Sequence, residues 1–430
     1  MKRKNLPIIV MKINMTSLKP SSKNSYRMHL NSSSVLVKKT VFCFIFIMSL
    51  LFTSQNTFAQ FGTLSPQAKV SLITIGPGQE LYSGFGHSVL WVYDPITGID
   101  NAYNYGTFSF KEGNFYVKFL RGTLPYTLSV APLSQQAPYW QEENRSIKEQ
   151  VLNLSPSQKQ KLFNVLETNY LPQNRKYQYK FFYDNCSTRM VDVLKAAVGD
   201  SLQFPGYTKD TLSFRQWIDR YAFKQKPWSD FGMDLAIGAP SDDIATPAQA
   251  TFLPDNLSSA FDDSKIKVGN RYVPLVSSTR DLFVAAPVAE KEWLTPMVFF
   301  WTLAVLVLAY TYYQTKKEQV NFTFDKILFT IVGLVGWLIL LLWFGTNHGV
   351  TTWNYDILWA FPLWLPLIWY ISETKKPAWF QFVLILYAIL IMASTANLVK
   401  HNFVVIPILA IIIIRIYYMN NSLSKIPQKG

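Results

Sequence analysis

Apolar and polar positions divide the chain into three regions with different periodicity. Residues 1–59 hold a basic stretch followed by a short apolar run at residues 40–52. Residues 60–290 alternate between strand-like and helix-like patterns, with polar turns between them. Long apolar runs follow Trp293. The pattern predicts a leader, a mixed globular domain and a membrane domain.

The middle region contains runs that are typical of strands. They are rich in β-branched and aromatic residues and are bounded by Gly, Asp or Pro. The predicted strands are KVSLITIG (69–76), SVLWVYD (88–94), YNYGTFSF (103–110) and YQYKFFYD (177–184).

Helical spacing of apolar residues predicts three helices in the same region. They cover residues 155–171, which begin with a Ser cap, residues 187–199, which end at Gly199, and residues 211–223. Residues 227–263 are rich in Pro, Asp and Ser, so we expect a loop with one short helix there.

The C-terminal region predicts five membrane spans, with four as the alternative, because the third run is broken by Pro362 and Pro366. The runs are 294–313, 327–344, 357–371, 378–397 and 402–419. Lysines concentrate in the loops 314–326 and 372–377 and in the tail 420–430, whereas the opposing loops hold only Lys400. This charge bias places the globular domain outside the cytoplasm.

The leader has the features of a signal peptide. Lys38 and Lys39 precede the apolar run, and Ala59 follows it at a small-residue cleavage position. Met28 is an alternative start, and an uncleaved anchor is the alternative to cleavage. We expect four segments: the leader (1–59), a globular domain outside the cytoplasm (60–290), a helical bundle (291–419) and a cytoplasmic tail (420–430).

Composition and charge narrow the possible functions. The chain has 430 residues, of which 49% are hydrophobic and 16% aromatic. The net charge of +14 suggests a nucleic-acid partner, but nine Lys/Arg and no Asp/Glu lie in residues 1–59, which leaves about +5 for the remainder. No basic, aromatic-interleaved stripe follows the leader, so we expect no nucleic-acid binding.

Cys186 is the only cysteine outside the leader, since Cys43 lies in the apolar run. Structural cysteines outside the cytoplasm normally occur in pairs. Cys186 stands where an aromatic strand is expected to end and a helix to begin, with Asp184 or Asn185 as cap. Backbone N–H groups there favour a thiolate and can bind an oxyanion. The alternative is a small buried hydrophobic residue.

His87, in GFGHS, is the only histidine of the middle region. Alone it could be a structural histidine, but together with Cys186 it provides the minimum for an activated thiol nucleophile. One cysteine and one histidine fall short of a zinc site, and no further ligands follow at ligand spacing. We therefore expect no metal and no cofactor.

The order of these motifs resembles a known family. A histidine at a strand start, followed about a hundred residues later by a cysteine that opens a helix, is similar to the permuted papain-like enzymes of the NlpC and lecithin:retinol acyltransferase clan. The stretches GPGQELYSGFGHSVLWVYD, YNYGTFSF, FLRGTLPYTL, FFYDNCSTR and FLPDNL more closely resemble the Lnb-type lipoprotein N-acyltransferases.

The resemblance implies an α+β fold, with a permuted papain-like (NlpC/LRAT-like) cysteine domain followed by an all-α transmembrane bundle of about five helices. It implies Cys186 as nucleophile and His87 as base. Asn104 and Glu80 fall in matching motifs and are the candidates for the residue that orients the histidine. Asp184 and Arg189 also match, and Arg189 could bind a phosphate or carboxylate or form a surface ion pair.

Three further residues are candidates for substrate binding. Arg121, in FLRGTLPY, could face a phosphate beside an acyl chain, or the stretch could be an ordinary strand and turn. His348 and Asn354, together with Asn347, form a polar cluster at a membrane–water boundary, where such groups often line a substrate path. A solvated loop is the alternative. We expect His401 to be interfacial.

The expected function is acyl transfer at the bacterial inner membrane. A bundle of several spans is larger than an anchor needs, which favours a substrate with acyl chains. The resemblance implies a phospholipid donor and a diacylglyceryl lipoprotein acceptor. The alternatives are a periplasmic NlpC-like cysteine peptidase or amidase acting on cell-wall peptides, and a non-catalytic membrane-tethered binding or assembly module.

Overall fold

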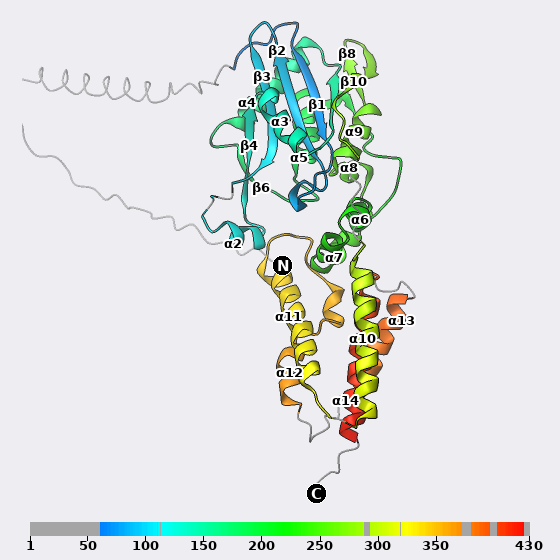
Figure 1. Ribbon diagram of the computed structural model, residues 1–430. Coiled ribbons are helices and arrows are strands. Elements are labelled where there is room, and N and C mark those ends of the chain that lie inside the picture. The colour runs from blue at the N-terminus through cyan, green and yellow to red at the C-terminus, as the bar shows by residue number, and fades with distance from the viewer. Residues whose placement is uncertain are drawn as a thin grey trace, which may run out of the picture. The chain divides into compact units, whose positions relative to one another are not determined.

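The computed structural model describes residues 61–109, 111, 113–287, 293–318, 320–371, 380–395 and 402–424 (Figure 1). The predicted signal peptide lies outside these residues, as does His401. The described chain is a mixed α/β structure, with a domain rich in β-sheet followed by helices.

An antiparallel sheet of seven strands organises the first domain within the described residues. In spatial order the strands are β10 (Val276–Phe283), β5 (Ile147–Leu152), β1 (Lys69–Ile75), β2 (His87–Asp94), β3 (Ile99–Thr107), β4 (Pro125–Ala131) and β6 (Lys176–Gln178). A smaller sheet contains β7 (Leu202–Gln203), β8 (Lys265–Val268) and β9 (Arg271–Pro274).

Both faces of the large sheet are covered, since every residue of β1 after Lys69 is buried. Leu72 packs in a core with α4 (Pro156–Tyr170), α5 (Cys186–Val198) and α9 (Pro254–Asp262). The next residue, Ile73, points to the other face and packs with α3 (Leu133–Glu142), because successive side chains of a strand point in opposite directions. The sheet therefore lies between α4, α5 and α9 on one face and α3 on the other (Figure 1).

Two predictions for this domain are wrong. The stretch 177–184 is a strand only up to Gln178, after which the chain folds into a tight turn in which the Lys180 carbonyl accepts the N–H groups of Tyr183 and Asp184. Phe182 of this turn is buried in a core with helices and loops rather than paired in a sheet, and Phe181 packs against the same core.

The second error concerns residues 227–263, which form helices rather than a loop. They are α7 (Pro227–Ala236), η3 (Ala239–Asp242), α8 (Pro247–Ala250) and α9, and they follow α6 (Phe214–Gln225). A proline occupies the first turn of each of these four helices. Proline is favoured at that position, where its missing N–H has no intrahelical partner, so these prolines begin helices instead of breaking them.

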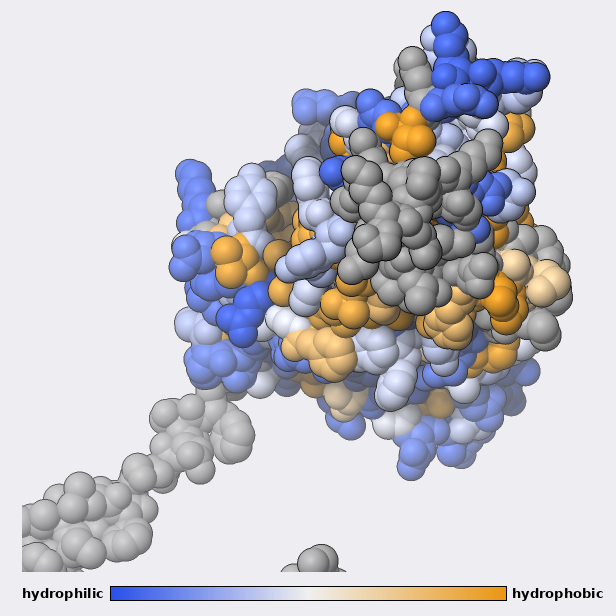
Figure 2. Space-filling view, turned by 90° about the horizontal axis from the view of Figure 1, so that it is seen from below, coloured by the Kyte–Doolittle hydropathy of each residue, from blue (hydrophilic) through white to orange (hydrophobic). Residues whose placement is uncertain are grey.

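Three helices of the second domain are long and apolar enough to cross a membrane, among the residues described. They are α10 (Pro296–Lys316), α11 (Thr323–Gly345) and α14, which runs over Val405–Ser424 and so continues past the predicted end at residue 419. Viewed from below, apolar residues spread across the middle of the molecule and hydrophilic residues gather around its edge (Figure 2).

The third predicted span is not a continuous helix. It consists of a 3-10 turn, η4 (Tyr355–Leu358), and a short helix, α12 (Trp364–Tyr370), separated at Pro362. Gly333 and Gly336 of α11 allow this irregular backbone to approach closely, since a Cβ at Gly336 would lie 1.9 Å from the Ala360 carbonyl oxygen. The fourth is represented by α13 (Phe380–Thr395). Three of the five predicted spans are thus long apolar helices among the described residues, and the total of five stays a prediction.

Hydrogen bonds connect the first domain to the membrane domain. The Asn347 N–H donates to the Arg121 carbonyl at 2.8 Å, and the Gly238 N–H donates to the Val350 carbonyl at 2.7 Å. Asn402 Nδ2 donates to Asp234 Oδ2 at 2.8 Å. The segments after α11 and before α14 therefore lie on the side of the first domain, as the lysine pattern predicted.

Candidate functional site

Cys186 is the first residue of α5, and its position is fixed by the cap residue before it. Asn185 Oδ1 accepts the N–H groups of Ser187 and Thr188 at 2.8 and 2.9 Å. The Asn185 Nδ2 group donates to the carbonyls of Phe181 and Phe252, both at 2.8 Å. The cap is itself buried, so it ties the helix start to two neighbouring loops.

This cap changes which donors can bind an oxyanion. Because Asn185 already accepts two N–H groups of the first turn, they are not available to a substrate. The Cys186 N–H has no hydrogen bond among those found in the described part of the chain. It is therefore the N–H of this turn that remains for an oxyanion beside the sulfur.

His87 begins β2 and is oriented by Asn104 of β3, whose Oδ1 lies 2.7 Å from His87 Nε2. Gln136 of α3 sets the direction of this contact. Its Nε2 donates to the Ala102 and Ala131 carbonyls, both at 3.1 Å, so its Oε1 accepts from Asn104 Nδ2 at 2.9 Å. Asn104 Oδ1 can only accept, so Nε2 of His87 carries a hydrogen. The other nitrogen, Nδ1, is thus the one that can exchange a proton with the thiol.

Gly106 is the point at which the side chains of the site converge. A Cβ there would lie 3.3 Å from the Tyr179 ring, 3.8 Å from Cys186 Cβ and 3.9 Å from His87 Cε1. Its φ of +88° lies in the region that favours glycine. The β3–β4 register shifts between Asn104 and Thr107, which is a local irregularity of the kind found beside active sites.

The electrostatics favour an ion pair between the two residues. Burial opposes charge on Cys186, which is 6% exposed, but the nearby charge of His87 and hydrogen bonds from His87, the Ser88 N–H and Ser187 together lower the pKa of the thiol. Burial also works against a charged His87, but the charge of Cys186 and the bonds to Cys186 and Asn104 raise its pKa. A thiolate beside an imidazolium is the reactive form of a cysteine nucleophile.

Three residues of the site were not among the candidates that the sequence indicated. Gln136 lies on α3 and affects His87 indirectly, through its hydrogen bond with Asn104. Ser88 and Ser187 have hydroxyl oxygens 3.0 Å apart, both buried, and Ser187 Oγ is 3.9 Å from Cys186 Sγ. The serines adjoin the two reactive residues, so the motifs GFGHS and DNCST contained them, but their contact depends on a fold that the sequence did not reveal.

Of the two candidates to orient the histidine, the structure brings only Asn104 to His87. Glu80 precedes the turn Leu81–Ser83 and is exposed. Its described hydrogen bonds use its carbonyl oxygen, which accepts from the N–H and the hydroxyl of Ser83. Glu80 therefore acts in the turn before β2.

Arg189 and Asp184 lie beside the site but bind one another. Both guanidinium contacts to Asp184 are short, and NH2 is 2.6 Å from Oδ2. The guanidinium also lies 4.3 Å from the centroid of the Tyr177 ring. The ion pair was the alternative to anion binding in the sequence, and the structure shows the ion pair.

The remaining substrate-binding candidates lie at the junction between the domains. The Arg121 side chain is exposed at the end of α2 (Phe115–Leu120). His348 Nε2 is 3.0 Å from the Leu120 carbonyl, so it holds the same helix end. Asn354 is buried, donates to the Leu235 carbonyl and accepts from the Asp356 N–H. Asn354 thus holds backbone of both domains in place.

A continuous series of aromatic rings, here named the aromatic row, leads from α2 to the site. Ring centroids are 6.0 Å apart for Phe119 and Phe115, 5.9 Å for Phe115 and Phe108, and 5.4 Å for Phe108 and Tyr126. Tyr126 then stacks on Tyr179 at 4.4 Å. Tyr179 meets Cys186 and His87 around Gly106.

The outer end of the aromatic row is exposed. On α2, Tyr116 is 80% exposed and Phe119 is 52% exposed, with Val117 and Leu120 beside them. The same helix is joined to the segment after α11 through the Asn347 and His348 contacts. An apolar surface next to membrane helices is therefore continuous with the rings that reach Cys186.

An α+β domain followed by helices that can cross a membrane defines a membrane protein with a large extramembrane domain. Two family models match this chain. The Lnb N-terminal periplasmic domain matches residues 58–219, and the Lnb transmembrane domain matches residues 288–425. Together they cover well over half of the sequence, so the chain belongs to the Lnb family, as the resemblance predicted. No curated protein and no solved structure matches it.

Family membership gives the broad assignment. The N-terminal domain is periplasmic and the C-terminal domain lies in a membrane. The family indicates an enzyme of lipoprotein biogenesis.

Proposed function

We propose that this protein transfers an acyl chain from a phospholipid to the N-terminal amine of a lipoprotein through a thioester on Cys186. One observation carries the proposal: the Cys186–His87 pair lies at the inner end of the aromatic row, whose outer end is the exposed helix α2 beside the membrane domain. A cysteine site that takes only soluble peptides would not need an apolar connection to the bilayer.

In the first half-reaction, His87 Nδ1 removes the thiol proton and the thiolate attacks an ester carbonyl of the phospholipid. The N–H of Cys186 donates to the oxyanion that forms. The C–O bond to the glycerol then breaks, and the imidazolium returns its proton to the leaving alkoxide. The products are the acyl-thioester on Cys186 and a lysophospholipid.

In the second half-reaction, the amine of the lipoprotein attacks the thioester carbonyl. His87 takes a proton from the attacking nitrogen, the C–S bond breaks, and Cys186 leaves as a thiolate. The product is an amide, which is more stable than the thioester. The rings of Tyr126 and Tyr179 next to the site limit the access of water, which would otherwise release a fatty acid.

The same pair could serve a peptidase or amidase on cell-wall peptides, with water as the second substrate. The order of a histidine strand before a cysteine helix, and a polar residue behind the histidine, are compatible with the papain-like fold of both enzyme classes. The aromatic row favours the transferase over the peptidase, because it connects the site to an exposed apolar helix. A binding module would not need the hydrogen-bond chain from Gln136 to His87.

A product assay separates these functions. The full-length protein in detergent–phospholipid micelles would receive a phospholipid with a labelled acyl chain and a synthetic diacylglyceryl lipopeptide. We expect labelled N-acyl lipopeptide and lysophospholipid in equal amounts, and neither product with Cys186→Ala. The exposed Asp200→Asn variant is the matched control.

Cleavage of muropeptides by the wild type, without lipid products, would replace the proposal with the peptidase. Full N-acylation by Cys186→Ala would refute the mechanism.

A further inference from the structure

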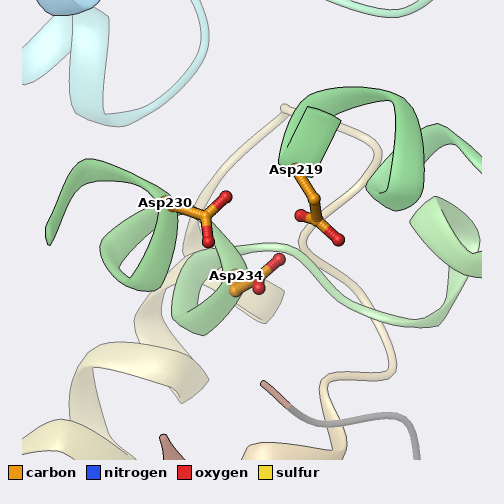
Figure 3. Close-up of side chains that lie close together, drawn as sticks. All are labelled: Asp219, Asp230 and Asp234. Carbon is orange, nitrogen blue, oxygen red and sulfur yellow. The ribbon is translucent and has the colours of Figure 1, made fainter. Parts of the chain in front are cut away.

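A cluster of three aspartates outside the Cys186 site has no role in the proposed reaction. Asp219 lies on α6, and Asp230 and Asp234 lie one helical turn apart on α7. Figure 3 shows their carboxylates pointing toward one another. One carboxylate oxygen from each lies within 4.8 Å of the others. Like charges at this spacing destabilise a helix, so their convergence needs a compensating group.

The protein supplies only part of this compensation. Arg215 NH1 binds Asp234 Oδ1 at 2.8 Å, but Arg215 Nε also binds Asp242 at 2.9 Å, so one cation serves two carboxylates. Asn402 donates to the other oxygen of Asp234. The electrostatic neighbours of the cluster also include Asp356 from η4, a further acidic group.

A second observation points to a ligand. Asp230 is 2% exposed, and its Oδ1 has no hydrogen-bond partner among the described residues. Asp219 Oδ1 is likewise buried and without a partner there. A buried carboxylate oxygen without a partner is costly. Burial and the neighbouring carboxylates raise the pKa of Asp219 to about 8 and that of Asp230 to about 7.

We propose that Asp219, Asp230 and Asp234 bind one divalent cation of the Ca²⁺ or Mg²⁺ class. Carboxylate oxygens are the ligands that hard cations prefer, and Asp219 and Asp230 each have one without a partner among the described residues. No sulfur or imidazole ligand stands with the three carboxylates in the described part of the chain. The expectation of no metal rested on cysteine and histidine spacing, which does not apply to an all-oxygen site. This inference does not depend on the proposed acyl transfer.

The site lies where the first domain meets the membrane domain. Asp234 is bound by Asn402, just before α14, and the Leu235 carbonyl next to it accepts from Asn354. A cation that fixes α6 and α7 would therefore also hold these membrane-domain segments in place. Loss of the cation is expected to loosen the junction without altering the Cys186–His87 contact.

Metal content and thermal unfolding of the full-length protein in detergent test the proposal. After treatment with EDTA and removal of the chelator, we expect CaCl₂ or MgCl₂ to raise the apparent unfolding temperature. Elemental analysis after dialysis against the same salt should give about one ion per chain. Asp230→Asn and Asp219→Asn should each weaken binding by roughly tenfold or more, because the charge of the ligand set controls affinity.

Asp200→Asn, on an exposed aspartate, is the matched control and should bind like the wild type. Wild-type protein that binds neither ion, and whose unfolding temperature does not respond to EDTA or salt, would overturn the proposal. Equal binding by wild type, Asp219→Asn and Asp230→Asn would also overturn it, by placing the ion elsewhere. Both results are independent of acyl-transfer activity, and the wild-type arm needs no variant to fold.

Discussion

Neighbouring side chains fix the orientation of the reactive residues, and two hydrogen bonds in series, Gln136 to Asn104 and Asn104 to His87, show this best. Two backbone carbonyls orient the Gln136 amide, which orients Asn104, which fixes a hydrogen on His87 Nε2. The nitrogen that faces the thiol is therefore determined by groups that never touch a substrate. Asn185 likewise fixes the position of Cys186, because it ties the start of α5 to two neighbouring carbonyl groups.

The ion pair predicts the pH dependence of thiol reactivity. The pKa of the Cys186 thiol is lowered and that of the His87 imidazole is raised, so the thiolate–imidazolium pair predominates at pH values between the two pKa values. Alkylation of Cys186 by iodoacetamide should therefore persist at pH values below the range in which an ordinary thiol reacts. His87→Ala removes the cation while burial remains, so the profile should move to higher pH. If the thiol of this variant is about ten times weaker as an acid, its alkylation at acidic pH should be about tenfold slower.

The measurement is the alkylation rate against pH, with the denatured protein as a reference for an unperturbed thiol. Identical profiles for wild type and His87→Ala would contradict the ion pair.

Asn104→Ala should lower kcat by roughly 10²-fold through misorientation of His87, with little change in KM, because a small displacement of a catalytic group is enough for such a loss. Gln136→Ala, which acts one contact further away, should have a smaller effect of the same kind. Glu80→Ala is the matched control, since it lies in a matching motif but does not contact His87. Equal losses from Glu80→Ala and Asn104→Ala would contradict this assignment.

At the level of elements, the sequence predicted those whose signal is local. The apolar run of β1, the Ser155 cap of α4 and the Gly199 end of α5 each correspond to the structure. Local patterns failed where tertiary packing decides. Phe182 is aromatic because it fills a core, not because it is in a strand, and Pro227, Pro247 and Pro254 begin helices.

The residues of the candidate site could be predicted from the sequence where their signal is local. Cys186, His87 and Asn104 stand out because each lies in a motif that resembles the family. Gln136 and the aspartates of α6 and α7 come from distant segments, and no spacing rule connects them. Arg121, His348 and Asn354 were polar residues at a boundary, and such residues equally serve to join two domains, as His348 and Asn354 do.

The helix α2 predicts a dependence on substrate form. Tyr116→Ser with Phe119→Ser removes two exposed rings from its surface and leaves the buried Phe115, on which they pack, in the chain. We expect lower kcat/KM with phospholipid in vesicles, because the apolar contact with the bilayer is lost, but unchanged turnover of a soluble short-chain thioester or ester. Tyr272→Ser, an exposed tyrosine on β9, is the control. Equal losses with both substrates would count against a membrane role for α2.

At the scale of the whole molecule, a buried ion pair that the sequence did not reveal joins helices of the membrane domain. Arg415 of α14 binds both oxygens of Asp325 on α11 at 2.7 Å, and Thr311 and Gln314 of α10 at 2.8 and 2.9 Å. Its guanidinium also lies 4.3 Å from the centroid of the Tyr418 ring. The Arg415 guanidinium therefore joins α14 to α10 and α11, and its charge is balanced by Asp325.

Asp325→Leu should destabilise the protein by about 3–5 kcal/mol, because it leaves Arg415 buried without its partner. The double variant Asp325→Leu/Arg415→Met should recover much of this loss, since neither charge then remains. The apparent unfolding temperature in detergent is the readout, with Lys317→Met at the exposed end of α10 as control. Additive losses in the double variant would show that the two residues are not coupled.

The central claim is that Cys186 carries the acyl chain, and mass spectrometry of this residue tests it most directly. Purified protein would be incubated with a phospholipid of known acyl mass, without an acceptor, and then digested. The account predicts a hydroxylamine-labile adduct of that mass on the Cys186 peptide, with lysophospholipid formed alongside and no adduct in His87→Ala. An unmodified Cys186 peptide, with neither lysophospholipid nor free fatty acid released, would contradict it.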